Sequence, residues 1–273
     1  MKTKILIGIS FLLITTILVA IFTKHLDSQK KENINNHRIE IVEKYCGYIK
    51  TKDCNEAVLK DEYTMAMLED VSDIVKEYDK TNLKEIEPIT VIPEIDLKKS
   101  DIFSYDIGNN EKVEVKYIKD EEYKEELSQI YLSGELMYKD KIYSNIGIRE
   151  QLGFVGKVGL HTFHSTELKY PLLIVAEEPI GSSRDKKAIY FLINDELVRY
   201  EIRYNNELTE QVLRSNIEVN VYIDIESNKP YIYSYWSDPA FIGNKISRWE
   251  IDHDKKMIVR ESSIIEVAGF VED

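Results

Sequence analysis

The sequence predicts an α+β protein in which an N-terminal transmembrane helix leads into a helical hairpin and then into an antiparallel β-rich domain. Three observations support this fold class. An uncharged apolar run occupies residues 5–22, apolar residues recur at helical spacing over 37–80, and alternating apolar runs follow Pro93. The predicted divisions are a transmembrane signal-anchor over 1–23, a linker over 24–36, the helical hairpin over 37–82 and the β-rich domain over 83–273.

The apolar run is long enough to cross a membrane. Its eighteen residues, Ile5 to Phe22, carry no charge and rise about 27 Å as a helix, close to the roughly 30 Å of a hydrocarbon core. Lys2 and Lys4 precede the run. By the positive-inside rule they keep the N-terminus in the cytoplasm, so the rest of the chain is expected to be extracytoplasmic.

The same run fits either a permanent anchor or a cleaved signal peptide. A signal peptide ends at a small-x-small site, and the nearest match is Ala20-Ile21-Phe22, in which Phe22 is a poor cleavage residue. No lipidation cysteine follows, because the first cysteine is Cys46. We therefore expect a single-pass protein of the cell membrane, whereas a mature N-terminus near residue 24 would indicate cleavage.

Two helices are predicted after the polar linker. The first begins near His37, and its apolar stripe consists of Ile39, Val42, Cys46 and Ile49. The second is expected over 55–80, with Asp53 as its N-cap and Glu56 three positions on, as in a capping box. Its expected apolar face carries Leu68, Val71, Val75 and Tyr78.

Cys46 and Cys54, the two cysteines of the chain, are predicted to form a disulfide, which an exported location permits. On one continuous helix their Cα atoms would lie about 12 Å apart, whereas a disulfide requires about 4.4–6.8 Å. The bond therefore requires a chain reversal, which Gly47 and residues 51–53 offer. The alternative is a pair of free thiols on helical segments.

The remainder of the chain is predicted to form mainly strands joined by turns. Residues 113–117 form the cleanest amphipathic strand, and a short helix over 120–127 precedes strands near 130–138 and 141–148. Three hairpins are expected, pairing 188–193 with 197–204, 218–225 with 231–236 and 246–251 with 257–261, with a short helix over 207–214. This spacing predicts an antiparallel meander arranged as a curved sheet, barrel or sandwich. A partial β-propeller would require a blade repeat of fixed period, and the sequence shows none.

The charge of the chain restricts its partners. The formal net charge is −13, and removal of Lys2 and Lys4 leaves −15 on the exported part. Such a surface repels phosphate backbones, which argues against nucleic acid as a partner. It suits basic partners or divalent cations, although solubility alone explains it most simply.

The histidine and carboxylate motifs do not form a recognisable catalytic or metal site. His161 and His164 are three residues apart on an expected strand, which directs them to opposite faces, and no Glu follows His161 as a zincin motif requires. Asp252-His253-Asp254 lies in a predicted hairpin turn, where Asp is common for backbone reasons.

Two further motifs also have simpler explanations. Asp224 and Glu226 share a strand face and read as exposed carboxylates, and Ser183-Arg-Asp-Lys186 matches Ser-x-x-Lys but lies in a loop rather than opening a helix. We therefore assign no catalytic residue, no metal ligand and no cofactor from the sequence.

The strongest binding candidate is an aromatic strand. Tyr231, Tyr233 and Tyr235 share one face of it. If that face is exposed, the rings form a platform for glycan or peptide; if it faces another element, they are core.

We therefore expect a membrane-anchored, extracytoplasmic binding or regulatory module of the cell envelope, without enzymatic activity. Its N-terminal helix contacts the membrane, and its partner is another envelope protein or cell-wall polymer. The alternative function is an envelope hydrolase acting on wall polymer or peptide, for which a pocket joining His161 or His164 to acidic residues would be the sign. A third reading is a structural, membrane-tethered domain that binds a second copy of itself.

Overall fold

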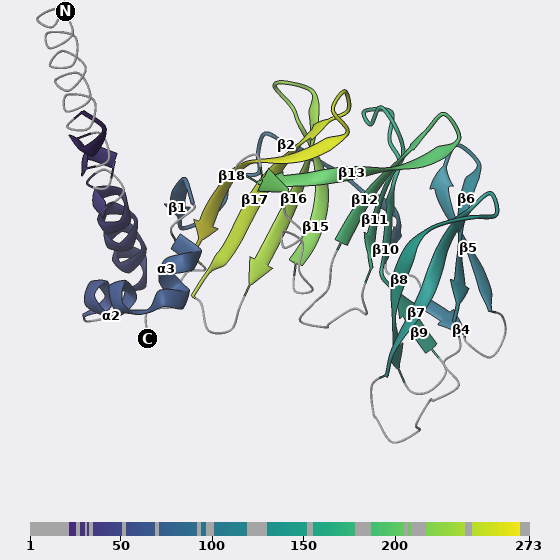
Figure 1. Cartoon of the computed structure of the whole chain (residues 1–273), viewed down its shortest axis with the longest axis horizontal. Helices are drawn as coiled ribbons and strands as arrows, with labels where there is room; N and C mark the ends of the chain where they lie inside the picture. The colour runs from purple at the N-terminus through teal and green to yellow at the C-terminus, as the bar shows by residue number, and fades with distance from the viewer. Residues whose placement is uncertain are drawn as a thin grey trace, which may run out of the picture. The chain divides into compact units, whose positions relative to one another are not determined.

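A computed structural model (Figure 1) describes residues 22–25, 28–30, 32, 35–50, 53–68, 71–91, 94–96, 101–118, 130–151, 155–177, 187–204, 207–208, 217–237 and 242–267. The chain divides into two compact units, Met1–Ile74 with Gly269–Asp273, and Val75–Ala268. Of the predicted transmembrane segment 1–23, only Phe22 and Thr23 are described, and the predicted helix 120–127 and the motif at 183–186 lie outside the described residues. No helix within the described ranges is long and apolar enough to cross a membrane.

The first unit contains the predicted first helix, which covers residues 35–49. Val42, Cys46 and Ile49 of the predicted stripe are buried, whereas Ile39 is 40% exposed. The described residues of the predicted linker 24–36 are helical as well.

The predicted disulfide is confirmed. Cys46 and Cys54 are bonded, with their Cα atoms 5.6 Å apart. The reversal uses Lys50 and Asp53, both of which have positive φ, at 56° and 60°. Gly47 stays inside the helix, so the reversal occurs without it.

The predicted second helix over 55–80 is wrong in length and continuity. The structure has two short helices, α2 (Cys54–Lys60) and α3 (Glu62–Leu68), followed by strand β1 (Asp73–Val75). Asp61 causes the break, because its carboxylate accepts the backbone N–H groups of Tyr63 and Thr64 at the start of α3. Asp53 occupies the N-cap of α2 as predicted, but its side chain makes no capping hydrogen bond.

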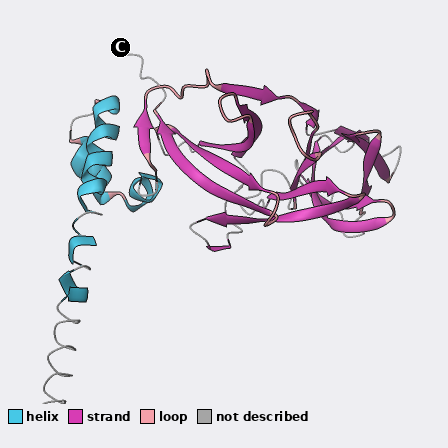
Figure 2. Ribbon diagram, turned by 90° about the horizontal axis from the view of Figure 1, so that it is seen from above, coloured by secondary structure: helices cyan, strands magenta, loops and turns pink. Residues whose placement is uncertain are grey.

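In the described residues every helix belongs to the first unit, whereas strands fill the second (Figure 2). The larger sheet of the second unit follows the order β2-β15-β16-β17-β18-β13-β12-β11-β10-β3, and β14 pairs with β13. Its strands are β2 (Leu83–Ile86), β3 (Pro88–Val91), β10 (Leu160–Phe163), β11 (Leu172–Ala176), β12 (Lys187–Ile193), β13 (Glu196–Tyr204), β14 (Glu207–Leu208), β15 (Ile217–Asp224), β16 (Lys229–Ser237), β17 (Asn244–Asp252) and β18 (Met257–Glu266).

This sheet is barrel-like. Its two end strands, β2 and β3, are consecutive in the chain, and only Glu87 separates them. The two ends of the strand order are therefore linked by a single residue. The enclosed core includes Phe191, Tyr200, Ile232 and Trp249. The ring of strands is therefore completed along the chain at Glu87, because β2 pairs with β15 and β3 pairs with β10.

The smaller sheet is antiparallel, in the order β4-β9-β8-β7-β6-β5. Its strands are β4 (Glu94–Asp96), β5 (Ile102–Gly108), β6 (Glu111–Tyr117), β7 (Ile130–Tyr138), β8 (Lys141–Gln151) and β9 (Val155–Val158). It packs against the outer side of the larger sheet, and β11 shows this directly. Leu172 and Ile174 join the barrel-like core, whereas Leu173 and Val175 join the core between the sheets.

Gly159 joins the two sheets where the chain passes from β9 to β10. Its N–H donates to the Gly147 carbonyl on β8, and its own carbonyl accepts the N–H of Ala176 on β11. A Cβ atom at this position would lie 2.5 Å from Ala176 Cβ, so the close approach requires glycine.

The β-rich prediction is confirmed, and the three predicted hairpins correspond to β12–β13, β15–β16 and β17–β18. Two details differ. β13 pairs with β18 in parallel, because β13 leaves β12 and continues beside β18 over Glu201–Arg203. The predicted helix over 207–214 is wrong at Glu207 and Leu208, which pair with β13.

Candidate functional site

The predicted tyrosines lie on the outer face of the barrel-like sheet. Successive side chains of β16 point to opposite faces of the sheet. Ile232 therefore joins the enclosed core, and Tyr231, Tyr233 and Tyr235 face outward. Register places Tyr231 opposite Tyr222 on β15. Together with Ile246, the tyrosines at 222, 231, 233 and 235 form a cluster that we call the tyrosine face.

The tyrosine face is not an open platform. Tyr233 is 0% exposed, Tyr231 is 5% exposed and Tyr235 is half-buried. The rings of Tyr222 and Tyr233 meet edge to face, with centroids 5.2 Å apart and an interplanar angle of 83°. The condition on which the platform reading depended, an exposed row of rings, is therefore not met in this conformation. Edge-to-face packing is typical of an aromatic core.

A short irregular segment covers these rings. Residues 76–82, which we call the strap, lead from β1 to β2. Tyr78 donates its hydroxyl hydrogen to the Tyr233 hydroxyl at 3.3 Å, and their ring centroids are 6.1 Å apart. The Lys80 ammonium lies 4.7 Å from the ring centroid of Tyr235. Tyr78 was predicted to lie on a helix, because its apolar neighbours recur at helical spacing, and that spacing concealed its role in the strap.

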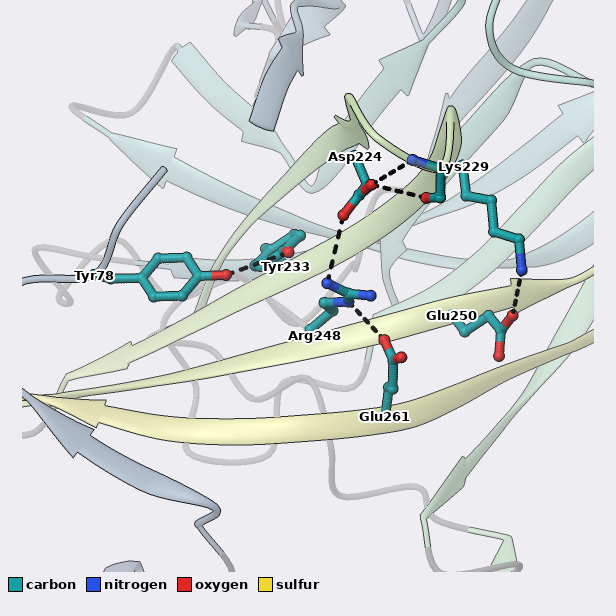
Figure 3. A network of polar contacts seen from close by, with 8 residues as sticks. Tyr78, Asp224, Lys229, Tyr233, Arg248, Glu250 and Glu261 are labelled. Atoms are coloured by element: carbon teal, nitrogen blue, oxygen red, sulfur yellow. Dashed lines mark hydrogen bonds and ion pairs between the residues drawn. The ribbon is translucent and has the colours of Figure 1, made fainter. Parts of the chain in front are cut away.

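A charge network lies next to the tyrosine face (Figure 3). Arg248, directly opposite Tyr233 on β17, donates from Nε to Glu261 at 2.6 Å and lies 3.8 Å from Asp224. Its guanidinium is 3.9 Å from the ring centroid of Tyr231. Asp224 also accepts hydrogen bonds from the backbone N–H and the hydroxyl of Ser227. A cation is thus fixed against an aromatic ring by two carboxylates.

The hydroxyl groups of this face are held in their neutral form. Burial, followed by the hydrogen bond with Tyr78, raises the pKa of Tyr233. Burial and the neighbouring Tyr222 raise the pKa of Tyr235, whose buried hydroxyl has no hydrogen-bond partner within the described part of the chain. Near neutral pH these groups offer hydrogen bonding and ring contacts rather than proton transfer.

The histidine and carboxylate motifs do not converge. His161 lies on β10 and His164 follows it, packed at Gly108. The carboxylate of Glu167 accepts hydrogen bonds from the Lys84 ammonium and the Ser165 hydroxyl. Asp224 joins the Arg248 network described above, whereas Glu226 is exposed in the following turn.

Asp252-His253-Asp254 forms the β17–β18 turn, as predicted, but His253 has contacts that the sequence did not reveal. Its Nδ1 is 2.8 Å from the Tyr200 hydroxyl, and the rings of Tyr170, Phe191 and Tyr200 surround it edge to face. Burial, followed by the charge of Lys169, lowers the pKa of His253. The His253 ring thus packs against Phe191 and Tyr200 of the barrel-like core.

No three histidine, cysteine, aspartate or glutamate side chains in the described ranges are placed to hold a metal ion. Comparison of the chain with protein-family models, with curated proteins and with solved structures gives no match. The function therefore has to be argued from the chemistry of the chain itself.

Proposed function

We propose that the chain is a membrane-anchored, extracytoplasmic binding or regulatory module of the cell envelope that has no enzymatic activity of its own. The observation that carries the location is the Cys46–Cys54 disulfide. Disulfides persist outside the reducing cytoplasm, and the lysines before the apolar run predict the same side of the membrane. Two independent features of the chain thus support one location.

The chemistry of the best-formed polar site supports binding rather than catalysis. The tyrosine face, which the strap covers in this conformation, and the adjacent Arg248 combine rings, neutral hydroxyls and an arginine that is already paired with two carboxylates. Such groups recognise a surface by contact and hydrogen bonding, and the pKa values of Tyr233 and Tyr235 are raised away from neutrality. The expected partner is an envelope protein or a cell-wall polymer.

The location is tested on the full chain in intact cells of its native host after removal of the wall. Externally added protease should digest the part after residue 36, and thiol labelling without reductant should leave Cys46 and Cys54 unmodified. A protected β-rich domain with two reactive thiols would refute an extracytoplasmic location.

The partner is tested by crosslinking in the native membrane. A photo-crosslinker at exposed Lys80, beside the tyrosine face, should capture a component that a crosslinker at exposed Lys112 on β6 does not capture. One stoichiometric membrane protein would support regulation, and wall fragments would support polymer binding. Equal, non-stoichiometric capture at both positions would count against a binding function for this face.

A further inference from the structure

Within the described residues, the strap contacts the neighbouring sheet through few of its side chains. Of its residues, only Tyr78 is partly buried, and the other residues between 76 and 82 are exposed. Two of its hydrogen bonds are local, from Thr81 N–H to Asp79 and from Leu83 N–H to the Lys80 carbonyl. Short-range bonds of this kind do not fix a segment to the sheet below it.

The anchor of the strap is Tyr78. Its backbone N–H donates to the Glu266 carboxylate on β18 at 2.8 Å, and its hydroxyl donates to Tyr233. The Lys80 contact with the Tyr235 ring assists, and at the far end the Asn82 carbonyl accepts the Ile225 N–H, which continues the β2–β15 ladder. Release of one side chain would therefore free the middle of the strap while both ends stay attached.

The cover hides groups that are unusual in an ordinary core. Tyr233 is fully buried although its hydrogen bond with Tyr78 is long, at 3.3 Å, and the hydroxyl of Tyr235 is buried without a described partner. Buried hydroxyls without good partners cost free energy. Exposure of these hydroxyls to water would recover part of that free energy. Opening of the strap therefore costs less free energy than opening of a core in which every hydroxyl has a hydrogen-bond partner.

The strap also begins where the chain enters the second unit. The chain passes between units at residues 74/75 and again at 268/269. Val75, the first residue of the second unit, accepts a backbone hydrogen bond of 2.9 Å from Val267, and the preceding residue, Glu266, holds Tyr78. Tyr78, the anchor of the strap, thus lies within a few residues of the point at which the chain enters the second unit.

We propose that the strap is a releasable cover, in which detachment of Tyr78 exposes the tyrosine face while the sheets stay folded. The opening is a local event of lower free energy than global unfolding. It is a property of the chain alone and goes beyond the proposed function, because it occurs whether or not a partner binds. Where the partner of the proposed function exists, the open form supplies it with rings and hydroxyls that the closed form conceals.

The test uses the full chain in detergent micelles and nitration of tyrosines by tetranitromethane, mapped by peptide mass. Tyr78→Ala should raise the nitration rate of Tyr233 and Tyr235 about tenfold or more, because the anchor ring is lost. Tyr78→Phe keeps the ring and should have a smaller effect, and Glu266→Gln weakens the bond to the Tyr78 amide and should fall between them. Tyr200, 2% exposed in the barrel-like core, serves as the internal reference and should stay unreactive.

Two outcomes would overturn the proposal. Unchanged nitration of Tyr233 and Tyr235 in Tyr78→Ala would show that the strap does not control their exposure. A joint rise in nitration at Tyr233 and Tyr200 would show that the strap cannot open without unfolding the sheet.

Hydrogen exchange of the wild-type chain gives an independent test, since the Tyr78 amide should exchange by local opening, well before the amides of β16. Exchange of both at the global unfolding rate would contradict a releasable strap.

Discussion

At the scale of single residues, buried polar groups on the inner side of the sheet are matched in pairs. The Trp249 indole N–H donates to the Ser234 hydroxyl at 2.9 Å, and both residues are buried. The adjacent Ser247 and Ser263 hydroxyls are 2.7 Å apart. These pairs allow polar side chains to occupy an interior that is otherwise apolar.

Ser234→Ala should lower the free energy of unfolding by about 1–3 kcal/mol, because it leaves the buried Trp249 N–H without a partner. Urea denaturation measures the effect. Ser133→Ala, the same substitution at an exposed position of β7, is the control and should change stability by less than about 0.5 kcal/mol. Equal effects at both positions would show that the indole hydrogen bond contributes nothing.

His253 should make the stability of the second unit depend on pH. Burial lowers its folded-state pKa below the ordinary 6.5. A base with a lowered folded pKa stabilises the fold fully above its unfolded pKa, and this stability is lost as the pH falls below 6.5. The melting temperature of the wild type should therefore fall more steeply on acidification than that of His253→Asn, as followed by circular dichroism.

Tyr200→Phe separates titration from packing at this site. It removes the hydroxyl that contacts His253 Nδ1 but leaves the titrating imidazole, so the steep decline below pH 6.5 should remain. Parallel pH profiles for the wild type and His253→Asn would contradict a lowered folded-state pKa of the half-buried His253.

At the scale of elements, local patterns predicted the strands well. The alternation in residues 113–117 and the turn residues after 193, 225 and 251 are contained within short windows, and β6 and the three hairpins form where they were expected. Elements that depend on distant partners were missed. The segment after Leu68 has helical spacing, yet Val75 pairs with Val267, nearly two hundred residues away.

Gly159→Ala tests the junction between the two sheets. The added methyl group would lie 2.5 Å from Ala176 Cβ, so the variant should lose about 1–3 kcal/mol of unfolding free energy in urea denaturation. Gly47→Ala is the matched control, because Gly47 is helical and a Cβ there meets nothing within 4 Å. It should raise stability by about 0.5–1 kcal/mol. A loss at Gly47 or none at Gly159 would contradict these assignments.

At the scale of the whole molecule, the sequence anticipated the β-rich composition, the disulfide and the position of the tyrosines. It did not predict that the sheet edges meet at Glu87, or that a segment assigned to a helix covers Tyr233. Both depend on pairing between distant parts of the chain, and periodicity in a short window carries no information about such pairing.

The disulfide should stabilise the first unit and leave the second unchanged. It closes a loop of about nine residues, and the double variant Cys46→Ser/Cys54→Ser should cost about 2–3 kcal/mol in the chain-entropy model. Hydrogen exchange should show faster exchange over residues 35–68, with the amides of β16 unaffected, because the two units are separately compact. Faster exchange throughout both units would show that they unfold together.

The meeting of β2 and β3 at Glu87 has a consequence for how the chain folds during its synthesis. Ribosomes make residues 83–91 early, but β2 pairs with β15, which ends at Asp224, and β3 pairs with β10. An emerging chain therefore carries two strands without partners until most of its length has been made. Contacts so distant in sequence form slowly, and unpaired strands associate readily with other chains. The ring of strands can close at residues 83–91 only after β15 has been made, so folding of this unit is completed only after most of the chain has emerged.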